Sequence, residues 1–135
     1  MHRLIAKAKR IAYTSEPCYH YIQRTNSISR NKRINYEPME ASLSQLQFFQ
    51  DHFPELIYIA ETACAFSHMG IITSHLGNQV QYSPDLFRKI RRVCKKHLKS
   101  VLRNAHIPKS RKLQALSFCY AFPIYKAVIE RTKHR

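Results

Sequence analysis

A short polar stretch from Tyr19 to Ser29 carries the densest set of side chains that could do chemistry in this sequence. It contains Arg24, Ser27, Ser29 and His20. A guanidinium offers a planar fork of N–H donors to phosphate oxygens, and serine hydroxyls add neutral donors. These residue types favour a site for a phosphate or a sugar. The alternative is a solvated loop, because arginines are common on protein surfaces, with His20 as a packed or solvated imidazole.

Two short strands and a turn are predicted to position these side chains. Residues 11–14 form a short apolar run with β-favouring side chains, and Pro17 ends it because proline cannot donate to a strand ladder. Residues 18–23 alternate and are rich in aromatic side chains, which predicts a second strand. Residues 24–27 are turn-like, since Asn and Ser bond their own backbone. A short helix over residues 2–10 is predicted to precede the hairpin.

The sequence around this hairpin resembles the end of the catalytic domain of family 2 glycosyltransferases. These are inverting enzymes of the GT-A fold that use nucleotide-sugar donors, and they often read K-K-I-x-Y-x-x-E-P-L-Y-Y-Y-R-x-R-x-x-S-I-S at this point. The matching positions in this sequence are, in chain order, Ile11, Tyr13, Glu16, Pro17, Tyr19, Tyr21, Arg24, Ser27, Ile28 and Ser29. The sequence departs from the commonest residues at Cys18, His20, Ile22 and Asn26. The resemblance covers residues 7–30.

The resemblance implies a role for each polar side chain of the stretch. Arg24 would offset the charge that builds up on the departing nucleotide diphosphate. Ser27, Ser29 and His20 would help to bind the diphosphate or the acceptor. The partners of the complete enzyme would be a nucleotide sugar and a glycan or lipid-linked acceptor. Such an enzyme would also use a divalent metal, Mg²⁺ or Mn²⁺, held by an Asp-x-Asp motif.

The parts of such an active site that carry out the transfer are absent from this sequence. Asp51 and Asp85 are the only aspartates, so no Asp-x-Asp motif occurs. No catalytic base can be assigned, and we expect no catalytic residue and no metal ligand in this chain. The resemblance therefore implies the C-terminal part of a transferase that serves a cell-surface polysaccharide or glycolipid, and we expect this chain alone to be inactive.

The charge of the chain is strongly positive and unevenly distributed. The formal net charge is +15, and from residue 86 onward the only acidic residue is Glu130. Such a balance favours a polyanionic partner. For a family 2 enzyme this would be the anionic inner face of a membrane, where each basic side chain contributes about 1 kcal/mol. Nucleic acid explains the charge equally well, so the alternative function is a non-catalytic basic helical module that binds nucleic acid or anionic membrane.

The predicted fold class is mainly α. Residues 1–33 would hold the short helix, the two short β-strands and the polar loop, as the end of a GT-A-like catalytic domain. Residues 34–135 would form a helical C-terminal domain of four helices. Pro38 and Pro54 are predicted in the first turns of two of them. The second of these helices is apolar nearly all round, so it should be the most deeply buried, and Gly77-Asn78 should end it.

Caps and prolines mark the other two helices. Ser83 is the predicted N-cap of the third, which has a basic side over residues 85–105. That side is either a solvated surface or a surface for a membrane or another polyanion. The fourth helix should follow Pro108 and be kinked at Pro123. Its candidates for burial are Leu113, Leu116, Phe118, Tyr120 and Ile124.

The cysteines and histidines are predicted to have structural roles. The four cysteines are widely spaced without a Cys-x-x-Cys pair, which favours reduced, buried thiols of a cytosolic protein over a zinc site. The histidines lack the spacing of a metal site on one helix.

The apolar runs look too short for a transmembrane helix, and the first residues lack the apolar core of a signal peptide. We expect a cytoplasmic protein that can lie on the inner face of the membrane.

Overall fold

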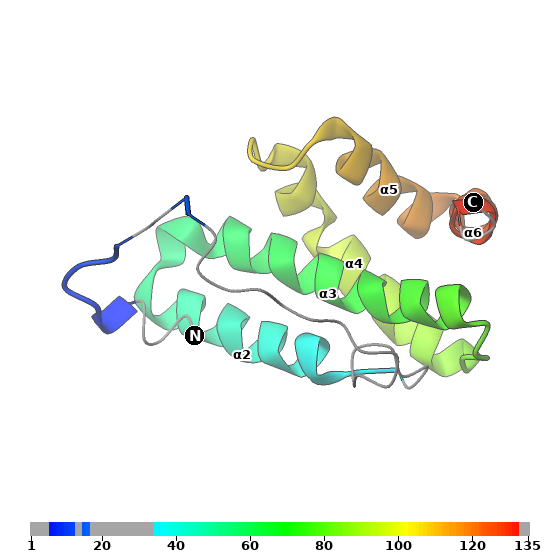
Figure 1. Ribbon diagram of the computed structural model, residues 1–135, viewed down its shortest axis with the longest axis horizontal. Helices are drawn as coiled ribbons and strands as arrows, with labels where there is room; N and C mark the ends of the chain where they lie inside the picture. Colours follow the sequence, from blue (N-terminus) through cyan, green and yellow to red (C-terminus); the bar gives the residue numbers. More distant parts are fainter. Residues whose placement is uncertain (1–5, 13–14, 17–33, 133–135) are drawn as a thin grey trace. The chain divides into compact units, whose positions relative to one another are not determined.

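The structure, a computed structural model, describes residues 6–12, 15–16 and 34–132. The chain divides into two compact units, Met1–Arg33 and Ile34–Arg135. The described residues of the second unit form five α-helices and one 3₁₀ turn (Figure 1). These are α2 (Glu37–His52), η2 (Pro54–Leu56), α3 (Ile57–Asn78), α4 (Pro84–Arg103), α5 (Lys109–Tyr120) and α6 (Phe122–Thr132). The prediction of a mainly helical protein is confirmed.

The predicted β-strands are not found in the described part of the chain. Ile11 and Ala12 of the first predicted strand are not in a strand, and the second, over 18–23, lies outside the described residues. The predicted first helix is also shorter than expected, since only Ala6 and Lys7 of the described residues in 2–10 are helical. A two-stranded hairpin is only marginally stable by itself, which is a physical reason for the absence of a strand at Ile11 and Ala12.

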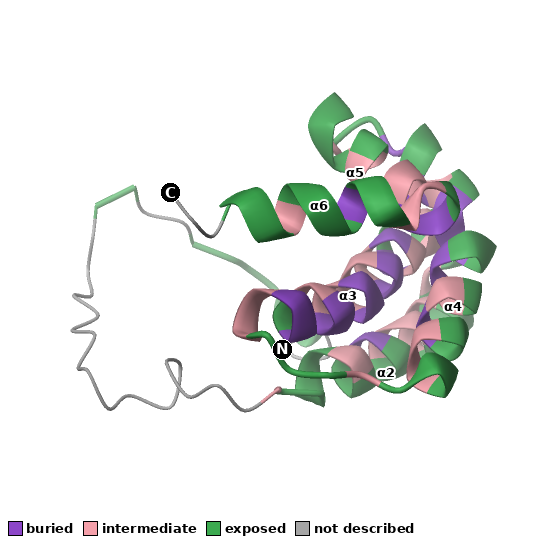
Figure 2. Ribbon diagram, turned by 90° about the vertical axis from the view of Figure 1, so that its right-hand side faces the viewer, coloured by how far each residue is buried: buried purple, intermediate pink, exposed green. Residues whose placement is uncertain are grey.

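The central helix of the second unit is α3. Ten of its residues are buried, and Figure 2 shows buried residues along its length. Helices α2, α4, α5 and α6 all contact it, as its apolar composition on nearly every side requires. The predicted deep burial is confirmed.

The sequence predicts no apolar run long enough to span a membrane. Judged by length and composition alone, this prediction is wrong. Residues Pro54–Asn78 are long and apolar enough to cross a bilayer. The same composition is needed by a helix that is surrounded by other helices, as α3 is. The finding alone therefore does not indicate a membrane span.

Backbone caps define the connection between α3 and α4. Gln79 adopts a left-handed conformation with φ of 57°. The N–H groups of Gln79 and Val80 donate to the carbonyls of Leu76 and His75 at 3.2 and 2.9 Å, which is the Schellman pattern that ends a helix. Ser83 then caps α4, because its hydroxyl accepts the backbone N–H of residue 86 at 3.1 Å. The predicted helix stop and N-cap are both confirmed.

An aromatic cluster fixes the last two helices to the bundle. Phe118 of α5 is 0% exposed. Its ring meets those of Phe87, Phe122 and Tyr125 edge to face, at centroid distances of 6.0, 5.7 and 5.1 Å. This is the arrangement that aromatic pairs prefer. The buried Tyr125 also shares a hydrogen bond of 2.5 Å with Thr73 of α3, so α4, α5 and α6 meet α3 at one place.

Pro123 breaks the predicted fourth helix into two. Helix α5 ends at Tyr120 and α6 begins at Phe122. Proline has no N–H to donate to the carbonyl four residues earlier, which is that of Cys119. This carbonyl instead accepts the Nε–H of Arg91 from α4 at 2.9 Å. The predicted kink is therefore a full break, and Arg91 has a structural role.

Three side chains that were predicted to be buried are exposed. Leu113 and Tyr120 of α5 are each 65% exposed, and Ile124 of α6 is 63% exposed. Phe118 is buried as predicted, and Leu116 is partly buried. Helix α5 contacts the bundle through the side that contains Phe118. Leu113 and Tyr120 are seven residues apart and therefore share a different side of the helix.

Candidate functional site

The residues predicted to bind a diphosphate lie outside the described residues. These are Arg24, Ser27, Ser29 and His20. Their grouping therefore stays a prediction. Three other groups of polar side chains are found in the described second unit. They are a cleft at the end of α3, a buried cluster between α3 and α4, and the exposed side of α4.

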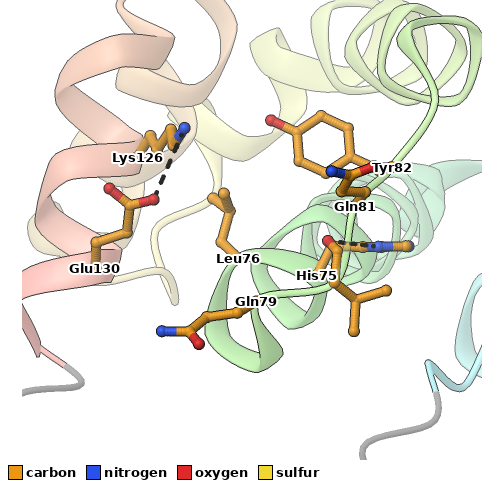
Figure 3. A pocket seen from close by; sticks show the side chains of 8 residues that line it. His75, Leu76, Gln79, Gln81, Tyr82, Lys126 and Glu130 are labelled. Carbon is orange, nitrogen blue, oxygen red and sulfur yellow. Dashed lines mark hydrogen bonds and ion pairs between the residues drawn. The ribbon is translucent and has the colours of Figure 1, made fainter.

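A cleft of about 400 Å³ lies between residues 75–82 and α6. In Figure 3, Lys126 and Glu130 extend from α6 on one side, and Gln81 and Tyr82 lie on the other. The Lys126 Nζ is 3.8 Å from the Glu130 Oε1, and both side chains are about half exposed. The cleft has donors and acceptors but no serine, threonine or cysteine among its lining residues.

His75 lines this cleft, and both of its ring nitrogens have partners. Its Nδ1 is 3.3 Å from the carbonyl oxygen of Val80, and its Nε2 is 3.0 Å from the hydroxyl of Tyr36. A carbonyl oxygen can only accept, so Nδ1 donates and Nε2 accepts the tyrosine hydroxyl proton. No ring lone pair remains for a general base. His75 instead ties the segment before α2 to the end of α3.

Polar side chains from α3 and α4 meet in a buried cluster. His97 of α4 is 4% exposed. Its Nδ1 is 3.4 Å from the Glu61 Oε1 of α3, without the geometry of a hydrogen bond. Ser100 donates its hydroxyl to the other oxygen of Glu61. The Asn104 amide donates to the Thr62 hydroxyl at 3.3 Å. The two hydrogen bonds constrain how the helices align, because a buried polar group is costly without a partner.

Burial also controls the charge of two histidines in this region. His68 is buried, and its Nδ1 is 2.9 Å from the carbonyl oxygen of Cys64 in the preceding turn. Burial lowers the pKa of His68 below its ordinary value of 6.5, and the hydrogen bond opposes this only in part. Burial likewise lowers the pKa of His97, against the opposing attraction of Glu61. Both imidazoles are therefore neutral at pH 7.

We expect the stability of the protein to decrease as the pH falls below about 6.5, the pKa of histidine in an unfolded chain. Between that value and the lower folded pKa values of His68 and His97, the unfolded chain binds more protons than the folded one. The free energy of unfolding then rises with pH in this window and levels off above it. Two such groups give a slope of up to about 2.7 kcal/mol per pH unit. Urea unfolding across the window measures this slope.

Substitution of each histidine separates this effect from general acid denaturation. His68→Gln and His97→Gln should each remove about half of the slope, because each takes away one of two proton-linked groups. His106→Gln is the control, since His106 is exposed. A slope that persists in full in both buried variants would contradict the assignment.

The three described cysteines are free, buried thiols. They are Cys64, Cys94 and Cys119. Burial raises the pKa of each thiol, so they stay protonated and are poor nucleophiles. The predicted buried thiols are confirmed for these three, and Cys18 lies outside the described residues. Within the described part of the chain, no group of three or more His, Cys, Asp or Glu side chains could hold a metal ion.

The exposed side of α4 is almost entirely basic. Its exposed Lys and Arg residues are Arg88, Lys89, Arg92, Lys95, Lys96, Lys99 and Arg103. Asp85, in the first turn, pairs with Arg88. The other basic residue of the helix, Arg91, is partly buried and bonded to α5.

The buried cluster was missed in the sequence, although a signal for it existed. His97 falls within the apolar stripe of α4, and Glu61 is the one acidic residue of the apolar α3. Ionisable side chains at apolar positions require a partner. The sequence alone could not say that these two residues were partners of one another.

No family model, curated protein or solved structure matches this chain. Any statement about its function therefore rests on its residues and their geometry.

Proposed function

We propose that this chain is the C-terminal part of a glycosyltransferase that moves a sugar from a nucleotide-sugar donor to a cell-surface polysaccharide or glycolipid acceptor. The observation that carries the proposal is the run of ten positions between Ile11 and Ser29 that match the pattern of family 2 enzymes in order. Ten ordered positions are far more specific than a short motif. Such enzymes have a variable helical tail after this run, and the helical second unit would correspond to that tail.

In the complete enzyme this segment would close beside the leaving nucleotide diphosphate. The bond between the sugar and the diphosphate breaks as the acceptor hydroxyl attacks, and negative charge grows on the phosphate oxygens. Arg24 would stabilise that charge with fixed N–H donors. The hydroxyls of Ser27 and Ser29 and the ring of His20 would donate further hydrogen bonds to the diphosphate or the acceptor.

The groups that activate the acceptor would belong to the preceding catalytic portion. The sequence has no Asp-x-Asp motif to hold Mg²⁺ or Mn²⁺. In the described helices, His75 has both nitrogens engaged and His97 is buried beside Glu61. The chain would therefore contribute binding and charge stabilisation, and its helices would support the segment that does so.

A chimeric enzyme tests the proposal. The catalytic portion of a family 2 glycosyltransferase would be followed by this chain in place of its own C-terminal part. We expect this chimera to transfer sugar and the purified 135-residue chain to transfer none. A matched chimera that carries only residues 34–135 should be inactive, because it lacks the segment with Arg24. Transfer by the isolated chain, or equal transfer by the two chimeras, would contradict the proposal.

A further inference from the structure

We propose that an exposed face formed by α4 and α5 docks on the anionic surface of a lipid bilayer. The basic side chains of α4 contact the headgroups, and apolar side chains of α5 enter the interface. The inference does not rest on the proposed sugar transfer. We call this surface the α4–α5 face, and it consists of Arg92, Lys95, Lys99, Arg103, Leu113 and Tyr120.

Contacts between α4 and α5 place Tyr120 beside the basic side of α4. The Lys95 Nζ lies 4.9 Å from the centre of the Tyr120 ring, so the exposed tyrosine adjoins the basic side of α4. The Lys112 Nζ donates to the carbonyl of Leu102 at 2.7 Å, which holds the start of α5 against the end of α4. Leu102 is itself exposed beside the basic side chains. Tyr120 therefore adjoins the basic side of α4, and Leu113 lies seven residues earlier on the same side of α5 as Tyr120.

The positive charge of the α4–α5 face is not neutralised within the described chain. Arg92, Lys95, Lys99 and Arg103 follow helical spacing and are all exposed. None of the four takes part in an ion pair with an acidic side chain of the described residues. Like charges held this close repel one another, and an anionic surface relieves that repulsion.

The apolar part of the face is well exposed. Leu113 and Tyr120 are both about two-thirds exposed. A cleft of about 520 Å³ between α5 and α6 continues this surface from Leu113 to Val128, which is also exposed. Cations beside exposed aliphatic and tyrosine side chains are the composition of helices that lie in a membrane interface.

A bilayer fits this composition better than nucleic acid or a second copy of the chain. The exposed residues of α4 are Lys and Arg apart from Pro84, Asp85 and Leu102. Lys and Arg contact nucleic-acid phosphates as well as lipid headgroups, so these side chains alone do not distinguish the two surfaces. The exposed Leu113 gains little from a phosphate backbone but is stabilised in lipid. A second copy would bring two positive faces together, which is unfavourable.

Binding of the full chain to vesicles tests the charge part of the proposal. We expect binding to vesicles of phosphatidylcholine mixed with phosphatidylglycerol, weakening with salt, and little binding to phosphatidylcholine alone. Replacement of Arg92, Lys95 and Lys99 by Gln should lower the partition coefficient on the order of a hundredfold, about fivefold for each charge. The control Lys7→Gln, Lys9→Gln, Arg10→Gln removes the same charge from exposed residues of the first unit. It should leave binding nearly unchanged.

An engineered tryptophan tests the apolar part, because the chain contains none. The emission of Leu113→Trp should shift to the blue on anionic vesicles and be quenched by brominated acyl chains. Leu43→Trp on α2, where the natural leucine is 47% exposed, should show neither change. The double variant Leu113→Ser, Tyr120→Ser should bind the same vesicles on the order of tenfold more weakly.

Four results would overturn the proposal. The first is no binding to the vesicles that contain phosphatidylglycerol. The second is binding that Leu113 and Tyr120 do not affect, which would mean adsorption by charge alone. The third is an equal spectral shift from Leu43→Trp. The fourth is tighter binding to duplex DNA or RNA than to vesicles at the same salt concentration.

Discussion

Phe118→Ala is expected to lower the free energy of unfolding by about 4 kcal/mol. Phe118 is fully buried and meets the rings of Phe87, Phe122 and Tyr125. Truncation leaves a cavity among three rings that cannot all move inward, so transfer and packing energy are both lost. A typical domain has a total stability of about 5–15 kcal/mol. The loss should appear as a large decrease in the urea midpoint, measured by circular dichroism at 222 nm, where α-helices give a strong negative signal.

A matched substitution on the same helix shows whether this effect comes from burial. Leu113→Ala removes an exposed side chain from α5, and we expect a change below about 0.5 kcal/mol. Phe118→Leu keeps most of the side-chain volume and should fall between the two variants. Similar small losses for Phe118→Ala and Leu113→Ala would mean that α5 does not depend on the aromatic cluster.

Arg24→Ala is expected to reduce the turnover of the sugar-transferring chimera by on the order of 10²–10³-fold. The guanidinium would act on charge that is fully developed only in the transition state. Most of the loss should therefore appear in kcat rather than in KM. Initial rates of transfer over a range of donor concentrations separate the two constants.

Two further arginine variants show whether the loss of turnover depends on the position and the planar shape of the Arg24 side chain. Arg33→Ala removes the same charge outside the matched run, which ends at Ser29, and should leave kcat unchanged. Arg24→Lys keeps the charge but not the planar fork, so it should recover only part of the rate. Equal rates for Arg24→Ala and Arg33→Ala would remove Arg24 from the site.

The end of α3 and the start of α4 could be predicted because their signals are local. Ser83 and Pro84 define the start of α4 through one hydroxyl and one fixed φ angle, whatever surrounds them. Gly77-Asn78 likewise marks the end of α3, although Gln79 takes the left-handed position. The burial of α3 followed from its own composition. Each of these features depends on a few adjacent residues.

The parts that could not be predicted depend on neighbouring helices. Leu113 and Tyr120 have apolar side chains at helical spacing, but α5 contacts the bundle through its other side. The pairing of His97 with Glu61 depends on how α4 lies against α3. The bond from Arg91 to the carbonyl freed by Pro123 joins residues far apart in the sequence. Hydrophobic periodicity identifies a helix but does not specify which side its neighbours will cover.

The most direct test of the proposed function is the position of the donor diphosphate relative to the segment with Arg24. A photoreactive analogue of the donor's nucleoside diphosphate would be cross-linked to the active chimera, and the labelled peptides identified after trypsin digestion. Trypsin cuts after Arg10, Arg24 and Arg30, so residues 11–24 and 25–30 are recovered as separate peptides. We expect label in one or both of these peptides, and excess unlabelled diphosphate should prevent it. Label confined to residues 34–135 or to the catalytic portion would contradict the proposal.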